Sequence, residues 1–141
     1  MSLFSVFNVA GSALNAETIR LNTTASNLAN AESIDGDPSK VYRGRHAVFQ
    51  TLMDQSDTTW DGEEASAGVR VLGIVESTAP PAMRYEPDHP KANKDGYVYM
   101  SNVNSIEEMT NMISANRSFA TNVEAVNTAR DLLLKTISMG R

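Results

Sequence analysis

The sequence predicts an α+β fold in which a long helix at each end of the chain flanks a small β-rich insert. Apolar residues near both termini recur at alternating spacings of three and four, which is typical of helices that pack as coiled coils. Turn-forming dipeptides are instead concentrated in the middle of the chain. We therefore expect an N-terminal helical arm at residues 1–32, a β and loop insert at 33–104, and a C-terminal helical arm at 105–141.

The N-terminal arm carries a seam of large and small residues. The large ones repeat every seven positions, at Phe7, Leu14, Leu21 and Leu28. Small residues occupy the alternate positions that we assign to the same seam, namely Gly11, Thr18 and Ala25. Small residues allow a partner helix to approach closely but bury little apolar area, so this helix is expected to be marginal by itself.

Three asparagines lie beside this seam, again seven residues apart, at Asn8, Asn15 and Asn22. They can form a solvated polar column. They can also fix the register between packed helices, as buried asparagines do in coiled coils. Both interpretations stay open at this point.

The C-terminal arm is predicted to begin at Ser105, whose hydroxyl can cap an exposed amide while Glu108 reaches back. It should end before Gly140. The first apolar column contains Met112, Phe119, Val126 and Leu133; the second contains Met109, Val123 and Ile137; the third contains Ile113, Ala120 and Leu134. Such a face is too wide for one thin partner helix, so part of it should meet other subunits.

The insert combines turns with two predicted strands. Valine alternation predicts a strand over residues 69–76, and a second strand over 97–100 follows the turn at Asp95-Gly96. The acidic stretch 53–67 contains few aliphatic residues and is expected to be an exposed loop.

Composition excludes several functional classes. The net charge is −5 and the basic residues are scattered singly, which argues against binding to nucleic acid. No apolar run approaches the length of a membrane span, so we expect no membrane insertion. The absence of cysteine excludes disulfides and thiolate chemistry. No Lys or Arg precedes Arg20, so the start lacks the basic region of a cleaved signal peptide and any export should use another route.

The sequence offers no anchor for catalysis. The two histidines, His46 and His89, lack a supporting motif and are interpreted as surface or turn residues. A calcium loop beginning at Asp57 fails because its twelfth position, which should supply a bidentate glutamate, is Gly68. We predict no catalytic, cofactor or metal site.

Several motifs resemble those of bacterial flagellar rod and hook axial proteins, and within them the proximal rod proteins of the basal body. The first is the stretch ASNLANA at residues 25–31, which follows RLN at 20–22. Further matches are YEPDHP at 85–90, GYV at 96–98, NVN at 102–104, EEM at 107–109 and SANRSF at 114–119. Together these matches span nearly the whole chain.

The resemblance implies a structural subunit that self-assembles through its terminal helices into the torque-transmitting rod in the periplasm. It implies export through the flagellar type III apparatus without a cleaved signal peptide. The implied partners are further copies of the chain, rod proteins of the FlgB, FlgF and FlgG types, the basal-body adaptor FliE and ring components.

We expect the assembly interface to use apolar and asparagine residues of both arms. The candidates are Phe7, Leu14, Leu21, Asn22, Asn27, Leu28, Asn30, Met112, Phe119, Val123, Val126, Leu133 and Ile137. Two other classes of function stay open: a free-standing helical adaptor or secretion chaperone, which would use the same heptads, and a hydrolase built on His46 or His89.

Overall fold

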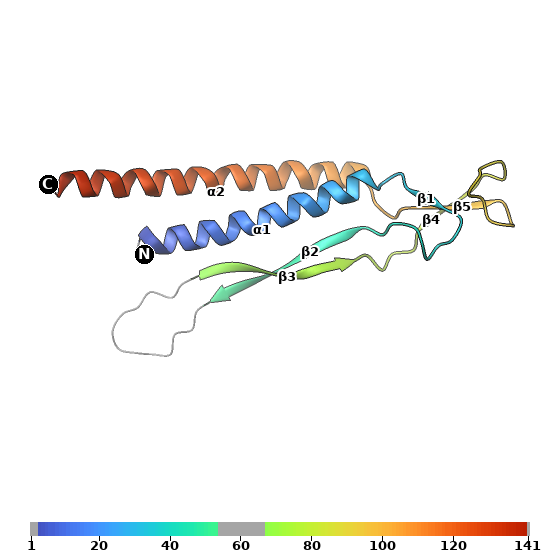
Figure 1. Ribbon diagram of the computed structural model, residues 1–141, viewed down its shortest axis with the longest axis horizontal. Helices are drawn as coiled ribbons and strands as arrows, with labels where there is room; N and C mark the ends of the chain where they lie inside the picture. The colour runs from blue at the N-terminus through green and yellow to red at the C-terminus, as the bar shows by residue number, and fades with distance from the viewer. Residues whose placement is uncertain (1–2, 54–66, 141) are drawn as a thin grey trace. The chain divides into compact units, whose positions relative to one another are not determined.

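The computed structural model describes residues 3–53 and 67–140 (Figure 1). The elements follow in the order α1 Leu3–Ala29, β1 Ile34–Asp35, β2 Arg45–Met53, β3 Ala67–Glu76, β4 Ala82–Tyr85, β5 Tyr97–Met100 and α2 Ser105–Met139. The predicted α+β class is confirmed, with one long helix at each end and strands between them. The expected loop at 53–67 lies, apart from its first and last residues, outside the described part of the chain.

The chain divides into two compact units. One contains Met1–Ile19, Val48–Gly73 and Ser114–Arg141, and the other contains Arg20–Ala47 and Ile74–Ile113. Both helices and both strands β2 and β3 contribute to each unit. The division of the chain into two arms and an insert stays a prediction about how the protein is organised.

On helix α1, the buried residues lie on the other side of the leucine column from the side that we predicted. Phe7, Leu14, Leu21 and Leu28 are half-buried, but Gly11, Thr18 and Ala25 are exposed. The buried neighbours of the column are instead Ala10 and Thr24, three residues after Phe7 and Leu21. Positions three and four residues away both lie beside a given helical residue, so spacing alone could not choose between them. The seam assigned to Gly11, Thr18 and Ala25 is therefore wrong within this chain.

Helix α2 begins with an asparagine cap. Asn104 Oδ1 accepts hydrogen bonds from the backbone N–H groups of Ile106 at 3.1 Å and Glu107 at 3.5 Å. The predicted cap at Ser105 is thus wrong, because the preceding residue already supplies the acceptor that the first helical turn requires. Glu108 does not reach back to the cap either. It is buried at 5% exposure and contacts Asn27.

One side of α2 is covered and shows the regular spacing of a coiled-coil helix. The predicted column of Met112, Phe119, Val126 and Leu133 is half-buried. The positions between these residues are also covered: Glu108, Ala115 and Ala129 are buried and Asn122 is half-buried. The other two predicted columns are exposed.

The strands form two small sheets. The first has the order β1-β5-β4 and is antiparallel, with Ile34 opposite Met100 on one side and Tyr85 opposite Tyr97 on the other. Its centre is Val98, which is fully buried. The second sheet pairs β2 with β3. Both predicted strands are confirmed, as β3 and β5, whereas β1, β2 and β4 are further strands beyond those two.

Gly96 shapes the turn that leads into β5. Its φ of +79° belongs to the left-handed region that favours glycine. A Cβ atom at this position would lie 2.9 Å from a ring carbon of Tyr85. The turn therefore depends on glycine both for its backbone conformation and for its space.

Candidate functional site

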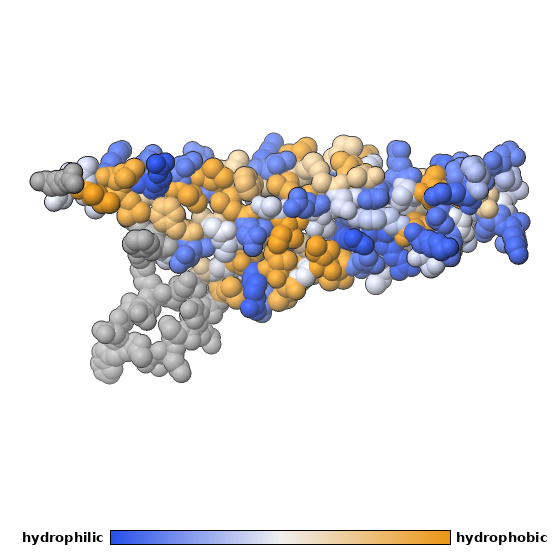
Figure 2. Space-filling model, in the orientation of Figure 1, coloured by the Kyte–Doolittle hydropathy of each residue, from blue (hydrophilic) through white to orange (hydrophobic). Residues whose placement is uncertain are grey.

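The outward side of α2 is a long exposed apolar stripe. Its large residues and their exposed fractions are Ile106 74%, Met109 50%, Ile113 56%, Val123 37%, Leu134 53% and Ile137 64%. These positions, together with Ala120, fall on an alternating spacing of three and four, which places them on one side of the helix. Three polar residues, Asn116, Asn127 and Arg130, interrupt the series. Figure 2 shows hydrophobic side chains at the molecular surface over α2.

This stripe is distinct from the covered side of the same helix. Ile113, Ala120 and Leu134 each follow a residue of the half-buried column, and successive residues of an α-helix are rotated by about 100°. Helix α2 therefore carries two apolar stripes on adjacent sides. Only one of them is covered by the described part of this chain.

The predicted interface residues fall into three groups. Nine are half-buried: Phe7, Leu14, Leu21, Leu28, Asn30, Met112, Phe119, Val126 and Leu133. Three are exposed, namely Asn22, Val123 and Ile137, and Asn27 is buried. No neighbouring subunit is present in the structure, so the interface stays a prediction.

The buried Asn27 is the centre of a polar network that joins α1, residues 42–45 and α2. Asn27 Nδ2 donates to the backbone carbonyl of Arg45 at 2.7 Å and to Glu108 Oε2 at 3.1 Å. Asn27 Oδ1 accepts from Tyr42 Oη and from the backbone N–H of Arg45, both at 2.9 Å. An asparagine side chain has two donor hydrogens and two acceptor lone pairs, so all of its capacity is used within its own chain.

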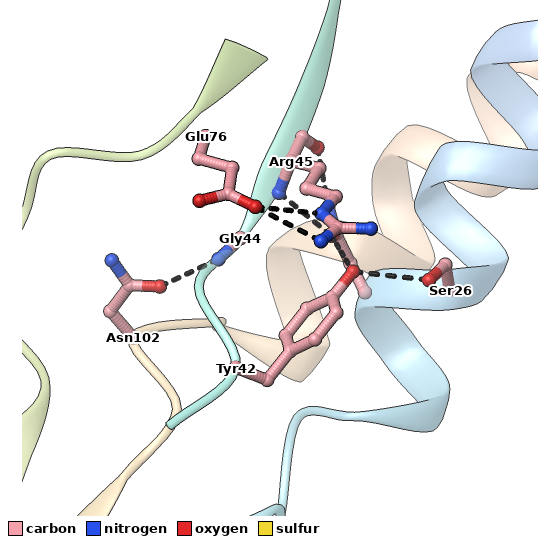
Figure 3. A network of polar contacts seen from close by, with 7 residues as sticks. Ser26, Tyr42, Gly44, Arg45, Glu76 and Asn102 are labelled. Carbon is pink, nitrogen blue, oxygen red and sulfur yellow. Dashed lines mark hydrogen bonds and ion pairs between the residues drawn. The ribbon is translucent and has the colours of Figure 1, made fainter. Parts of the chain in front are cut away.

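Further contacts extend this network (Figure 3). Tyr42 Oη also contacts Ser26 Oγ at 3.1 Å, and the Arg45 guanidinium pairs with Glu76 at 2.9 Å. The backbone N–H of Gly44 donates to Asn102 Oδ1 at 2.8 Å, and Asn102 Nδ2 donates to the carbonyl of Ala79. The network thus fixes the chain where it leaves α1 and where it enters α2.

Sequence reasoning identified Asn27 as an interface residue and missed its partners. The available signal was its position in the ASNLANA stretch, between the half-buried Ser26 and Leu28. Tyr42, Arg45 and Glu108 lie far from it in sequence, and no local pattern connects them.

A second polar contact attaches β3 to α1 in the other compact unit. The Ser12 hydroxyl donates to the carbonyl of Val9 at 2.8 Å and accepts from the backbone N–H of Val69 at 3.1 Å. A Cβ at Gly68 would lie 3.4 Å from Ser12 Oγ, an ordinary contact distance. The space beside Gly68 therefore admits a Cβ, and the attachment of β3 to α1 depends on the Ser12 hydroxyl.

The two histidines occupy the surface and turn positions that the sequence indicated. His46 is exposed in β2, and His89 Nδ1 accepts a hydrogen bond from the backbone N–H of Lys91 at 3.1 Å. Residues 3–53 and 67–140 contain no cluster of three or more potential metal ligands. Among the same residues, neither helix is long and apolar enough to cross a membrane.

Comparison with known proteins gives full-length similarity to flagellar rod proteins. Residues 7–32 match the family described as "Flagella basal body rod protein", and residues 94–139 match "Flagellar basal body rod FlgEFG protein C-terminal". The chain is 43% identical over 141 residues to the flagellar basal-body rod protein FlgC of Salmonella typhimurium, covering 100% of both chains. It is equally similar to FlgC of Yersinia enterocolitica, and it is 40% identical to FlgC of Buchnera aphidicola subsp. Schizaphis graminum with 99% of each chain covered.

The first matched segment contains most of α1, the second contains β5 and α2, and these relatives align over 99–100% of their length. The chain belongs to the FlgC family of flagellar basal-body rod proteins.

Proposed function

We propose that this structural subunit of the flagellar basal-body rod assembles through the outward stripe of α2. The observation that carries the proposal is the row of apolar side chains on one side of a single helix, each between 37% and 74% exposed. A soluble monomer rarely exposes so long a row, because its transfer out of water is favourable. Packing against other rod subunits would cover it. The similarity to rod proteins does not favour the alternative function, a free-standing adaptor or secretion chaperone.

Within each subunit we propose that the two helices pair as a coiled coil. The covered side of α2 has the heptad spacing that such pairing requires, and two of its buried residues, Ala115 and Ala129, are small and permit close approach of a partner helix. The hydrogen bond from Asn27 to Glu108 joins the last turns of α1 to the first turn of α2. The half-buried Phe7, Leu14, Leu21 and Leu28 would then contribute to this pairing before they contribute to assembly.

The exposed side of α1 supports a second contact between subunits. Gly11, Thr18 and Ala25 are exposed, and so are Asn8, Asn15 and Asn22 beside them. A column of small residues would admit a neighbouring helix closely, and the asparagines could fix its register. In this proposal the column of small residues and the column of asparagines both act between subunits.

We further propose partners and a route consistent with rod assembly. The partners are other copies and rod proteins of the FlgB, FlgF and FlgG types, with FliE and ring components beside them in the periplasm. The subunit would pass through the flagellar type III apparatus with its first residues retained and would transmit torque without catalysing a reaction. Mass spectrometry of the protein from basal bodies tests the route: loss of about 20 N-terminal residues, as signal-peptide cleavage removes, would contradict it.

The assembly proposal is tested by placing a charge on the outward stripe. Ile137→Glu and Ile113→Glu should leave the monomer folded, because both side chains are exposed, and should prevent rod assembly and motility. The matched control is Thr121→Glu, which adds the same charge to an exposed position about 80° around α2 from Ile113. Charges at Leu21 or Val126 are less informative because both residues are half-buried and would disturb folding as well. Normal rods from both isoleucine variants would refute the proposal.

A further inference from the structure

A polar hollow of about 670 Å³ lies beside the Asn27 network, entirely within one compact unit. Its basic lining residues are Lys40, Arg43, Arg45 and Lys91, and its acidic ones are Asp35 and Glu76. The hollow therefore has more cations than anions, in a chain whose net charge is −5.

Both acids of the hollow already have basic partners. Asp35 lies 3.6 Å from Lys91, and Glu76 lies 2.9 Å from Arg45. Lys40 has only a distant ion pair at 4.0 Å with Asp37, outside the hollow. Arg43 is exposed and has no acidic partner among the residues that the structure describes. The Ser33 hydroxyl oxygen, also in the lining, is buried without a hydrogen-bond partner in the same part of the chain.

These groups would recognise a carboxylate. Arginine binds carboxylates with two parallel hydrogen bonds, and a serine hydroxyl can donate a third. The Arg45 guanidinium lies over the Tyr42 ring, 5.5 Å from its centroid, so this wall of the hollow is held in place.

The chain itself carries a matching acidic segment. Between Arg45 and Arg70 there is no Lys or Arg, whereas the acidic residues there are Asp54, Asp57, Asp61, Glu63 and Glu64. The chain has 17 acidic and 12 basic residues, so setting aside these five acids leaves 12 of each. The whole net negative charge is therefore confined to this segment.

A rod assembled from copies of this chain would bring the acidic segment of one copy close to the hollows of its neighbours, at a high effective concentration. Every copy carries both the cationic hollow and the acidic segment, so the same contact can repeat from copy to copy.

We infer that this hollow receives the acidic segment 54–64 of a neighbouring copy, with Arg43 as its principal anchor. The inference rests on the proposed assembly into a rod. It assigns a partner segment to a surface other than the apolar stripe of α2.

The first experiment is cross-linking in basal bodies, which is simple because the chain contains no cysteine. Cells would co-express a Ser39→Cys chain and a Thr58→Cys chain, and isolated basal bodies would be treated with a short bis-maleimide. Ser39 lines the hollow and Thr58 lies within the acidic segment, so both variants keep every charged group of the proposed contact. We expect a dimer that contains one chain of each kind. Lys94→Cys replaces Ser39→Cys as the control, since Lys94 is an exposed residue of the same unit outside the hollow, and it should not yield the dimer.

The second experiment measures binding in solution, with a labelled peptide of residues 53–67 added to the full-length protein. Arg43→Glu should weaken binding by about threefold to tenfold at low salt, Arg43→Lys should weaken it less, and Lys94→Glu should have little effect. In cells, Arg43→Glu should impair rod assembly. A chain that carries both Arg43→Glu and Asp57→Arg should recover part of that assembly.

The outcomes separate this inference from the proposed function. If the protein is absent from basal bodies, the proposed function fails, and the peptide measurement alone decides the inference. The inference is overturned if both cysteine chains enter the rod without forming the mixed dimer, if Ser39→Cys links instead to a different protein, or if a chain with both cysteines links only internally. Equal peptide binding by the wild type and Arg43→Glu would overturn it as well.

Discussion

Replacing Asn27 by alanine should destabilise the protein more than any other single asparagine change on α1. The substitution removes four hydrogen bonds at a position that is 1% exposed. Alanine is a better helix former than asparagine, and this gain offsets the destabilisation by about 0.7 kcal/mol at most. The net effect therefore depends on the four groups that lose their partner.

The size of the effect follows from these groups. Tyr42 Oη keeps its contact with Ser26, so its loss is small. Glu108 is buried, and the backbone N–H and C=O of Arg45 are partly buried, so these three groups lose a bond that water replaces poorly. At about 1–3 kcal/mol for each buried group left unsatisfied, and less for the partly exposed Arg45, the total is about 3–5 kcal/mol. This loss is a large part of the free energy of unfolding of an ordinary protein, which is about 5–15 kcal/mol.

The assay is urea unfolding of the monomeric full-length chain, followed by circular dichroism. Asn22→Ala is the matched control, because Asn22 is exposed on the same helix and its change should stay within about 0.5 kcal/mol of the wild type. Asn27→Asp keeps the acceptor but loses both donor bonds and adds a carboxylate beside Glu108, so it should be at least as harmful near neutral pH. A free energy of unfolding for Asn27→Ala within about 1 kcal/mol of the wild type would refute the structural role of the network.

Three further predictions concern other parts of the chain. Gly36→Ala should lower the melting temperature, because its Cβ would lie 2.5 Å from the Lys91 carbonyl oxygen, whereas Gly11→Ala, with nothing within 4 Å, should raise stability by about 0.5–1 kcal/mol. Val98→Ala should cost about 2 kcal/mol in urea unfolding because Val98 is fully buried, and Met83→Ala on the exposed edge strand β4 should cost much less. Hydrogen bonds from Ser39 hold the pKa of Asp37 below that of an ordinary aspartate, so the turn is stabilised above the unfolded-state pKa and loses that stabilisation as the pH falls through the folded-state value. Titration by nuclear magnetic resonance should show this low pKa, and Ser39→Ala should move it back towards the ordinary value.

The sequence by itself determined the class of fold, the position of both helices and two of the strands, β3 and β5. It could do so because these features depend on local periodicity, which a single chain displays directly. It also indicated that α2 carries more apolar surface than one partner helix can cover, and the exposed Ile113, Leu134 and Ile137 agree with that expectation. The family followed from motifs near both ends and was confirmed by relatives of the same length.

Only the tertiary structure decided which side of each helix is covered. A leucine column is flanked equally by positions three and four residues away, and the choice of Ala10 and Thr24 over Gly11 and Ala25 depends on what packs against α1. The same holds for Glu108, which local chemistry assigned to a helix cap and which instead contacts Asn27, 81 residues away in sequence. Contacts of that separation leave no periodic trace in the sequence, because each is set by the folded path of the backbone between the two residues.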